Sequence, residues 1–275
     1  MVGGPPLAGL RVLAFTHAWV GPFCAELLAF NGADVVQVES RQHPDEFRAG
    51  IFEGEVPPKL SDVASAVNSW NCQPQYNAVN LNKRAITVDL KTPEGADLLR
   101  RLVAKADVVV ENFSVRVKER LGIGYETLRR TNHDLVMLSI SGYGQTGPWS
   151  GRLAGGGQIE ASSGMASLMG HAEEPMNYSR TIADPTAGYY ALVAVLAALR
   201  HRRRTGEGQH VDLAMQEANH CCVGDAMLEY FETGRVRERM GNRHLSFAPH
   251  GIYPTRGEDR WVALAAESET AWRRS

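Results

Sequence analysis

Short apolar runs with strand character alternate with helical stretches along most of this chain, and this alternation constrains the fold more than any other feature. The predicted strands are residues 10–15, 33–39, 85–90, 107–111, 135–141 and 209–213. The predicted helices are residues 22–31, 93–105, 115–121, 125–131, 159–169, 184–204 and 215–233. Strands separated by helices favour parallel pairing, because the helix provides the crossover. The alternation therefore predicts an α/β fold with a mostly parallel, doubly wound sheet.

Two irregular stretches interrupt this pattern. Residues 42–80 are rich in Pro, Asn and Ser and predict a long excursion with one short helix near 63–69. After residue 233 we expect a linker, then a strand at 261–265 and a helix that begins at Glu269. We expect residues from about 235 onward to pack poorly or to lean on a partner. The predicted division is a large domain (1–233), a linker (234–250) and the start of a small, apparently truncated domain (251–275).

Composition and charge argue against several classes of protein. Hydrophobic residues make up 44% of the 275 residues, which is enough for a large core. The 29 basic and 31 acidic side chains give a net charge of −2, so we expect no binding to nucleic acid or to an anionic membrane. The four cysteines form no C-x-x-C pair, and no segment has the pattern of a secretion signal or a membrane span. We therefore expect free thiols and a cytoplasmic location.

Asp184 and Pro185 precede the longest apolar helix of the sequence. This pattern predicts an Asp N-cap followed by Pro at the first helical position. The amino end of a helix carries about half a positive charge, so we expect the Asp184 carboxylate to be ionised and held by backbone N–H groups. Such a carboxylate is either a cap alone or a positioned nucleophile. Residues 181–188 by themselves favour the cap.

Several other motifs compete as functional sites. Residues 142–147 match the G-x-G-x-x-G dinucleotide pattern, but a loop follows instead of a helix, which argues against nicotinamide or flavin binding. The basic residues 200–204 fit the carboxyl end of a helix or a phosphate of a ligand. The histidines have no metal-ligand spacing, so no metal site is expected. The loop 16–22 and Asn112-Phe113 follow predicted strands, at the edge where α/β sheets bind ligands.

Eight short stretches, each weak alone, occur in one characteristic order along the chain. They are Leu7-Ala-Gly-Leu-Arg-Val-Leu13, Gly32-Ala-Asp-Val-Val36, Asn82-Lys-Arg84, Asp107-Val-Val-Val-Glu-Asn-Phe113, Glu119-Arg-Leu-Gly122, Gly142-Tyr-Gly144, Asp184 with Gly188, and Thr205-Gly-Glu-Gly-Gln209. Together they resemble CoA-transferase family III, the CaiB/BaiF group. That group includes formyl-CoA and carnitine CoA-transferases and α-methylacyl-CoA racemase.

The resemblance implies a fold and a set of site residues. The fold is a Rossmann-like large domain with a smaller second domain, in two chains interlocked like chain links. The catalytic aspartate of the family corresponds to Asp184. Phe113 would lie against the adenine of coenzyme A, and Arg120 would pair with a phosphate. The positions expected to contact coenzyme A are His17, Ala18, Trp19, Arg41, Leu90, Asn112, Phe113 and Arg120.

Several positions depart from the family pattern, among them Ser114-Val-Arg116, which replaces the usual Arg-Pro-Gly after Asn112-Phe113. Ser40 stands where members often carry an arginine that contacts the nucleotide, although Arg41 adjoins it. Trp19 replaces the glutamine of formyl-CoA transferases, which argues against a formyl or oxalyl substrate. Gly156 stands where racemases have a catalytic histidine, which argues against chemistry at the α-proton.

The activity implied by the resemblance is transfer of CoA from an acyl-CoA donor to a carboxylic acid, through an anhydride and a thioester formed on Asp184, with no metal. Two alternatives stay open. One is an acyl-CoA racemase or isomerase that uses Asp184 as an acid or base. The other is a CoA-binding subunit or fragment, because we expect this chain alone to have little or no activity. The expected partners are acyl-CoA, a carboxylic acid, and either a second copy in an interlocked homodimer or the other half of a split enzyme.

Overall fold

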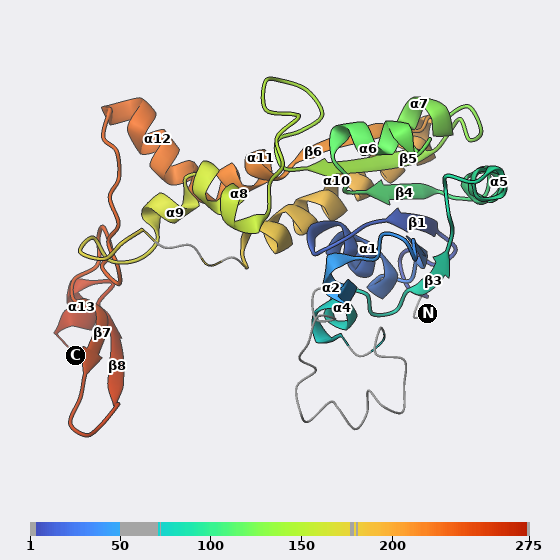
Figure 1. Cartoon of the computed structure of the whole chain (residues 1–275). Helices are drawn as coiled ribbons and strands as arrows, with labels where there is room; N and C mark the ends of the chain where they lie inside the picture. Colours follow the sequence, from blue (N-terminus) through green and yellow to red (C-terminus); the bar gives the residue numbers. More distant parts are fainter. Residues whose placement is uncertain (1–3, 50–70, 72, 177–178, 180, 274–275) are drawn as a thin grey trace.

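Six parallel strands form the central sheet of the protein (Figure 1). The computed structural model describes residues 4–49, 71, 73–176, 179 and 181–273. The strands are β1 (Arg11–Phe15), β2 (Asp34–Glu39), β3 (Arg84–Thr87), β4 (Val108–Glu111), β5 (Val136–Ser141) and β6 (His210–Ala214). Their order in the sheet is β3-β2-β1-β4-β5-β6, and every neighbouring pair is parallel. The predicted α/β fold with a doubly wound, Rossmann-like sheet is confirmed.

The order of the strands reverses between β1 and β4, which are neighbours at the centre of the sheet. The last residues of the two strands, Phe15 and Glu111, lie opposite each other. The connections that leave these two strands run to opposite sides of the sheet, so they separate and leave a crevice. The loop 16–19 and Asn112 therefore flank the place where an α/β sheet binds its ligand.

Helices lie in the connections between the strands of the main sheet and follow its last strand. They are α1 (Val20–Phe30), α2 (Glu46–Ala49), α4 (Pro74–Ala78), α5 (Pro93–Val103), α6 (Val115–Arg120), α7 (Tyr125–Leu128), α8 (Gly156–Ser162), α9 (Met165–Leu168), α10 (Ala183–Thr205), α11 (Met215–His220), the 3₁₀ helix η2 (Cys221–Val223), α12 (Gly224–Thr233) and α13 (Glu269–Trp272). Among the described residues, no helix combines the length and the apolar character needed to cross a membrane.

Two predicted helices are interrupted in the structure. The helix expected over 159–169 divides into α8 and α9 at Gly164, whose positive φ of 87° is unfavourable for other residues. The helix expected over 215–233 divides into α11 and α12 at η2. The excursion 42–80 contains α2 and α4, which were not predicted, whereas the short helix predicted near 63–69 lies outside the described residues.

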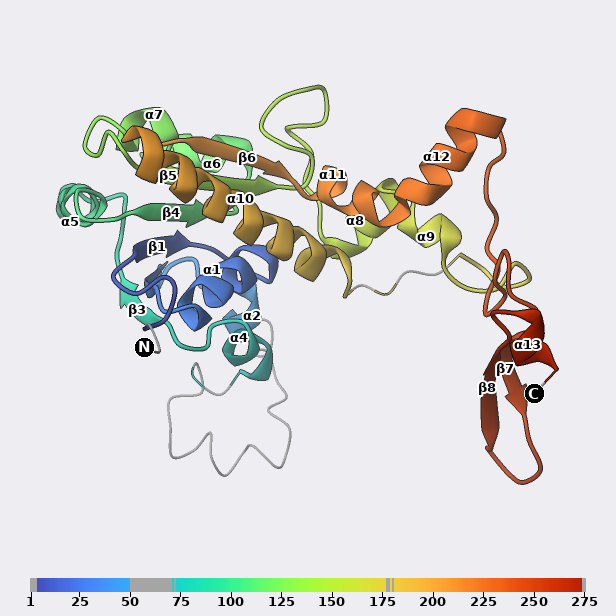
Figure 2. The same cartoon turned by 180° about the vertical axis from the view of Figure 1, so that it is seen from behind.

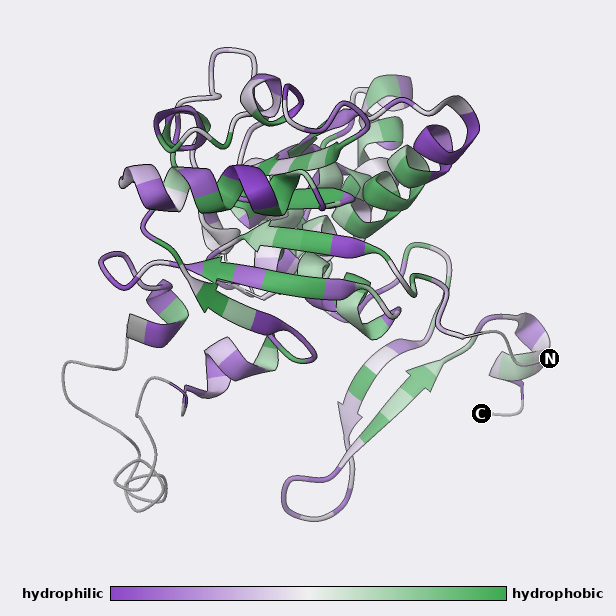
Figure 3. Cartoon of the chain, turned by 90° about the vertical axis from the view of Figure 1, so that its right-hand side faces the viewer, coloured by the Kyte–Doolittle hydropathy of each residue, from purple (hydrophilic) through white to green (hydrophobic). Residues whose placement is uncertain are grey.

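Each face of the sheet has its own core, because successive strand residues point to opposite faces. On one face, Val12 of β1 and Val108 of β4 pack with α1 and α10. On the other face, Leu13 and Val109 pack with apolar side chains of α5, such as Val103, and of α7. The sheet is mostly hydrophobic (Figure 3), most continuously in the central strand β4, as expected where a sheet is covered on both sides.

A two-stranded antiparallel hairpin lies apart from the main sheet (Figure 2). It pairs β7 (His250–Pro254) with β8 (Trp261–Ala265). The strand predicted at 261–265 is present, but β7 was missed because the predicted linker extended to residue 250. Five large apolar side chains of the hairpin are exposed: Ile252, Tyr253, Trp261, Val262 and Leu264. The division into a domain over 1–233, a linker over 234–250 and a second unit over 251–275 stays a prediction.

The segment between α12 and β7 has specific contacts with the main body. The Arg239 guanidinium donates to the backbone oxygens of His171 (3.1 Å) and Glu174 (2.9 Å). The Gly241 N–H donates to the backbone oxygen of Gly170 (2.9 Å). This stretch is therefore docked on the loop that follows α9, whereas β8 is exposed along its whole length.

Helices α1 and α10 make a close contact on one face of the sheet (Figure 2). Gly188, one turn after Asp184, permits this contact. A β-carbon at Gly188 would lie 2.7 Å from Cδ1 of Phe23 and 3.5 Å from the backbone oxygen of Val20. The missing side chain therefore allows the first turns of the two helices to approach each other, which places Asp184 beside the start of α1.

We expect Gly188→Ala to destabilise the protein, because the added methyl group must displace the Phe23 ring or move the two helices apart. Overpacking of this kind costs about 1–3 kcal/mol, which outweighs the better helix propensity of alanine. Urea unfolding monitored by circular dichroism would measure the change. Gly224→Ala is the matched control, since a β-carbon at Gly224 meets nothing within 4 Å. Equal unfolding free energies for Gly188→Ala and the wild type would contradict the tight contact.

Candidate functional site

Two cavities open at the carboxyl edge of the sheet and meet at the loop Thr16–Trp19, here named the β1 loop. The Phe113 cavity has a volume of about 430 Å³ and the Asp184 cavity about 480 Å³. Four predicted site residues line the Phe113 cavity: His17, Leu90, Phe113 and Arg120. Five line the Asp184 cavity: His17, Ala18, Trp19, Asn112 and Asp184. His17 thus lines both cavities, whereas Arg41 is exposed and belongs to neither lining.

Two side-chain amides hold the backbone of the β1 loop. Asn112 accepts a hydrogen bond from the His17 N–H through Oδ1 (2.9 Å) and donates through Nδ2 to the His17 backbone oxygen (2.8 Å). Gln37 of β2 donates to the backbone oxygen of Thr16 (2.6 Å) and accepts from the Thr16 hydroxyl (2.9 Å). Each amide satisfies one donor and one acceptor of a loop residue. Asn112, predicted to contact CoA, is therefore also a structural clamp of the β1 loop.

Asp45 holds the next residue of the loop from the side of α2. Both oxygens of its buried carboxylate accept the N–H of Ala18, at 3.2 and 3.1 Å, and Oδ1 also accepts the N–H of Phe47 (2.8 Å). Ala18 has a φ of +60°, a left-handed conformation that is uncommon for alanine and persists only where the surroundings stabilise it. The ring of Trp19 packs against that of Phe47 with centroids 6.4 Å apart. The β1 loop and the start of α2 are therefore one connected unit.

Asp184 is half-buried in the first turn of α10. The helix begins at Ala183 with Ile182 at the cap position, so the prediction that Asp184 is the N-cap is wrong. The backbone N–H of Val20, the first residue of α1, donates to the Asp184 carboxylate. The contact at Gly188 thus brings a second helix amino terminus to this carboxylate.

Burial raises the pKa of Asp184 to about 6, and the carboxylates of Glu160 and Glu46 act in the same direction. The hydrogen bond from Val20 lowers this pKa, but it does not compensate for the effect of burial. The sequence predicted that the helix end alone would keep the carboxylate firmly ionised, and the structure shows that burial and two like charges oppose that effect. At pH 7 a group with this pKa is still about nine-tenths ionised, and it is more basic than an ordinary aspartate.

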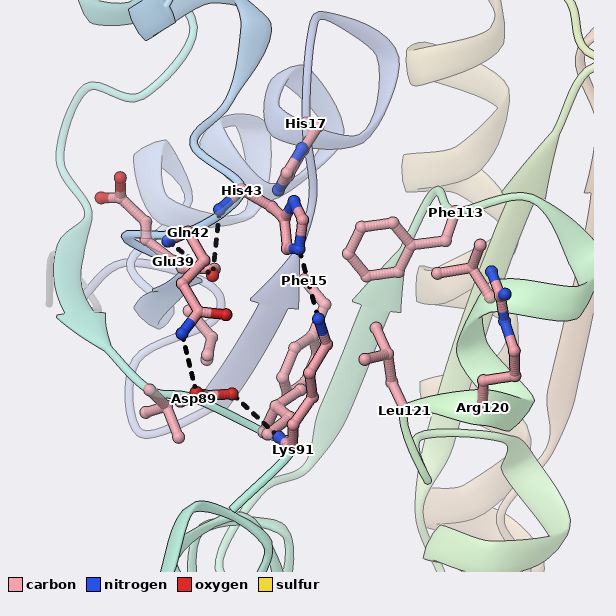
Figure 4. A pocket seen from close by; sticks show the side chains of 15 residues that line it. Phe15, His17, Glu39, Gln42, His43, Asp89, Lys91, Phe113, Arg120 and Leu121 are labelled. Carbon is pink, nitrogen blue, oxygen red and sulfur yellow. Dashed lines mark hydrogen bonds between the residues drawn. The ribbon is translucent and has the colours of Figure 1, made fainter.

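Aromatic and cationic side chains converge on the Phe113 cavity (Figure 4). The Phe113 ring contacts the His17 imidazole edge to face, with centroids 5.4 Å apart. On the side of β3, Lys91 Nζ lies 3.3 Å from His43 Nε2. On the opposite side, the exposed Arg120 ends α6. The carboxylates Glu39 and Asp89 also line the cavity, which therefore presents an aromatic face and side-chain charges of both signs.

The sequence analysis missed Lys91, His43 and Gln42 as cavity residues. For Lys91 a signal was present, because it follows β3 at the same carboxyl edge of the sheet as the β1 loop. His43 and Gln42 lie in the irregular excursion, where the sequence pattern gave no orientation.

Burial lowers the pKa of His17, which favours the neutral form of the imidazole that both cavities share. Among the described residues, no group of three His, Cys, Asp or Glu side chains is arranged for metal binding.

A buried ion pair supports the Phe113 side of the site. Lys118 Nζ lies 3.4 Å from Glu111 Oε1, and both side chains are almost completely buried. The ammonium also donates to Ser139 Oγ (3.1 Å) and to Gln145 Oε1. The second oxygen of Glu111 accepts the N–H of Phe113 (2.9 Å). The pair therefore fixes α6 to β4 and β5 and orients the start of the Phe113 turn.

Comparisons with known proteins agree with these features. The sequence model of CoA-transferase family III matches residues 7–275. The chain is 38% identical over 271 residues to the succinate–glutarate CoA-transferase of Agrobacterium fabrum, covering 98% of this chain and 65% of that protein. It is 36% identical over 272 residues to the beta subunit of the succinyl-CoA–L-malate CoA-transferase of Chloroflexus aurantiacus, covering 98% of this chain and 64% of that protein. The chain thus spans less than two thirds of the length of these relatives.

A solved structure supports the same relationship. The fold is similar to that of a CaiB/BaiF family protein from Brucella suis, with a TM-score of 0.83 and 33% sequence identity. The similarity covers 96% of this chain and 66% of that one. Because the family's sequence model extends over nearly the whole chain and the fold agrees, the chain belongs to CoA-transferase family III.

Proposed function

We propose that this chain carries the CoA-binding and nucleophilic part of an acyl-CoA:carboxylate CoA-transferase. The observation that carries the proposal is the position of Asp184, a basic, half-buried carboxylate in a cavity that meets the Phe113 cavity at His17. A nucleophile has to lie within reach of a thioester whose nucleotide is bound elsewhere, and two cavities that share His17 in their linings are suited to that separation. The relatives named above are CoA-transferases of dicarboxylic acids, which supports the same reaction class.

The Phe113 cavity is the proposed site of the nucleotide half of CoA. Phe113 offers a face for the adenine ring. Arg120 and Lys91 stand on two sides of the cavity and are suited to the phosphate groups. The pantetheine arm would then pass His17, whose neutral ring adds no charge along the path, and would place the thioester in the Asp184 cavity.

The proposed reaction exchanges acyl groups on Asp184. A carboxylate oxygen attacks the thioester carbonyl carbon of the donor, the C–S bond breaks, and an aspartyl anhydride and CoA thiolate form. The thiolate attacks the aspartyl carbonyl carbon, which releases the donor acid as a carboxylate and leaves aspartyl-CoA. The acceptor carboxylate attacks this thioester, giving a second anhydride and thiolate. The thiolate finally attacks the acceptor's acyl carbon, which releases the new acyl-CoA and restores Asp184.

This chemistry requires that water be kept from the anhydride and the thioester. Trp19 and Phe47 form an aromatic wall of the Asp184 cavity, and Met215 adds apolar surface. The remaining protection would come from a partner, either a second copy in an interlocked homodimer or the other half of a split enzyme. Some relatives are named as alpha and beta subunits, which supports the second arrangement.

Racemisation or isomerisation of an acyl-CoA is the less favoured alternative. It requires an acid or base on the face of the α-carbon opposite to Asp184. Gly156, where racemases have their histidine, lines the Asp184 cavity and supplies no such group.

Asp184 is expected to become acylated during turnover. Incubation with a donor acyl-CoA followed by hydroxylamine or borohydride should label the peptide that contains Asp184, because these reagents trap the anhydride or thioester. Asp184→Ala should abolish the label while CoA still binds. Mass spectrometry of the digested protein measures the label, and full turnover by Asp184→Ala would show that the carboxylate has no catalytic role.

The raised pKa of Asp184 predicts a stability effect of defined sign. The native state binds the Asp184 proton more tightly than the unfolded state, so the contribution of this group to the free energy of unfolding falls as the pH rises from about 4 to about 6 and is constant above that range. Asp184→Asn should therefore be more stable than the wild type above pH 6, by about 1–2 kcal/mol after allowance for solvent screening, and equally stable below pH 4. Urea unfolding at pH 4, 6 and 8 measures the difference. A wild type that is more stable than Asp184→Asn at pH 8 would disprove this sign.

Arg120 is expected to contribute to CoA binding rather than to folding. Arg120→Gln should weaken CoA binding by roughly 1.5–3 kcal/mol, the range for a charge-assisted hydrogen bond, and should weaken dephospho-CoA binding less if the guanidinium contacts the 3′-phosphate. Isothermal titration calorimetry measures both ligands. Arg116→Gln, on the same helix but outside the cavity lining, is the matched control and should bind both ligands like the wild type. Unchanged CoA affinity in Arg120→Gln would remove this residue from the proposed site.

A further inference from the structure

Glu160 of α8 is a fully buried carboxylate that lies outside both cavity linings. Its oxygens accept hydrogen bonds from the Ser179 N–H (2.7 Å), the Ser179 hydroxyl (2.7 Å) and the Ile182 N–H (3.1 Å). All three donors belong to the segment that leads into α10. These three donors offset part of the cost of removing the carboxylate from water.

Ile182 lies two residues before Asp184, so its hydrogen bond to Glu160 acts directly on the turn that carries Asp184. From the other side, the buried Asn219 of α11 donates to the backbone oxygen of Ala183 (3.1 Å) and to that of Met215 (2.8 Å). The peptide that precedes Ile182 and the peptide that follows Ala183 are thus held by Glu160 and by Asn219. Neither side chain can reach a substrate through the cavity lining.

We propose that Glu160 is a positioning residue for Asp184: its buried carboxylate orders the turn that presents the nucleophile and brings a second carboxylate close to it, through the hydrogen bond to Ile182. This inference rests on the proposed function, and it adds a role for a residue that is not in contact with any substrate. The ordering depends on hydrogen bonds, whereas the effect of the second carboxylate on Asp184 depends on charge.

Two carboxylates and one backbone N–H, from three neighbouring elements, act on the pKa of Asp184. Glu160 of α8 and Glu46 of α2 are like charges, and Glu160 has the larger effect. The Val20 N–H of α1 opposes them, together with the backbone at the start of α10. A stronger base is a stronger nucleophile as long as it remains ionised, so a pKa near 6 suits a carboxylate that must attack at neutral pH.

Glutamine at position 160 would conserve the shape of the side chain but remove its charge. Only one of its two polar atoms accepts hydrogen bonds, so at least one N–H or O–H donor of the 179–182 segment would lose its partner. Ser179→Ala is the complementary change, because it removes the hydroxyl donor and leaves the carboxylate charge in place. The two variants therefore separate the effect of charge from the effect of hydrogen bonding.

The test is a pH titration of the Asp184 carboxyl carbon by ¹³C NMR in protein labelled at aspartate, with the signal assigned by its absence in Asp184→Asn. The wild-type midpoint is expected near pH 6. In Glu160→Gln the midpoint should move toward the ordinary aspartate value of about 4, whereas in Ser179→Ala it should stay near that of the wild type. Amide hydrogen exchange at Ile182 should be faster in Glu160→Gln. In the pH dependence of kcat/KM, the acid limb should move to lower pH in Glu160→Gln only.

Several results would overturn the inference. A titration midpoint near pH 4 for Asp184 in the wild type, the value of an ordinary aspartate, would overturn the inference. This result needs no variant, so the test stays valid even if Glu160→Gln fails to fold. A folded Glu160→Gln with an unchanged midpoint, or Ser179→Ala with the same shift, would exclude a charge effect. The titration requires no turnover, so it is independent of the proposed function. That function would fail separately if Asp184→Ala retained full CoA-transfer activity.

Discussion

The close contact of α1 with α10 is the constraint on which the site depends. Gly188 permits it, because any side chain there would meet Phe23. The contact brings the first backbone N–H of α1 to Asp184, and the same helices cover one face of the sheet beside the switch between β1 and β4. A feature of core packing therefore also determines the surroundings of the carboxylate.

The β1 loop joins the two cavities, and its conformation is imposed from three directions. Gln37 belongs to β2, Asn112 follows β4, and Asp45 precedes α2. Together they hold Ala18 in a left-handed conformation that a free loop would rarely adopt. These contacts keep His17 in place, where it belongs to the linings of both the Phe113 and the Asp184 cavity.

The sequence allowed the sheet to be predicted because buried parallel strands are rich in apolar residues. The Asp-Pro pair before a long helix drew attention to Asp184, but it favoured a cap, and only the family resemblance suggested a nucleophile there. The sequence did not reveal that α8 and α9 are separate, since the break depends on the φ of one glycine among several. It also did not reveal Lys118, which the pattern of a short helix leaves at the surface and which the structure buries against Glu111. Such pairings join residues whose distance in space is set only by the sheet.

The protonation of Asp184 is the clearest case in which tertiary structure reverses a local expectation. A helix amino terminus stabilises an ionised carboxylate by a few tenths of a kcal/mol to about 1 kcal/mol when it is exposed. Partial loss of hydration and the proximity of Glu160 and Glu46 act against it, and the balance raises the pKa to about 6. Burial is therefore not merely a cost of placing this carboxylate inside a cavity. Because the helix ends keep the group largely ionised while burial makes it more basic, the two opposing effects together give it the properties that the proposed nucleophile requires at neutral pH.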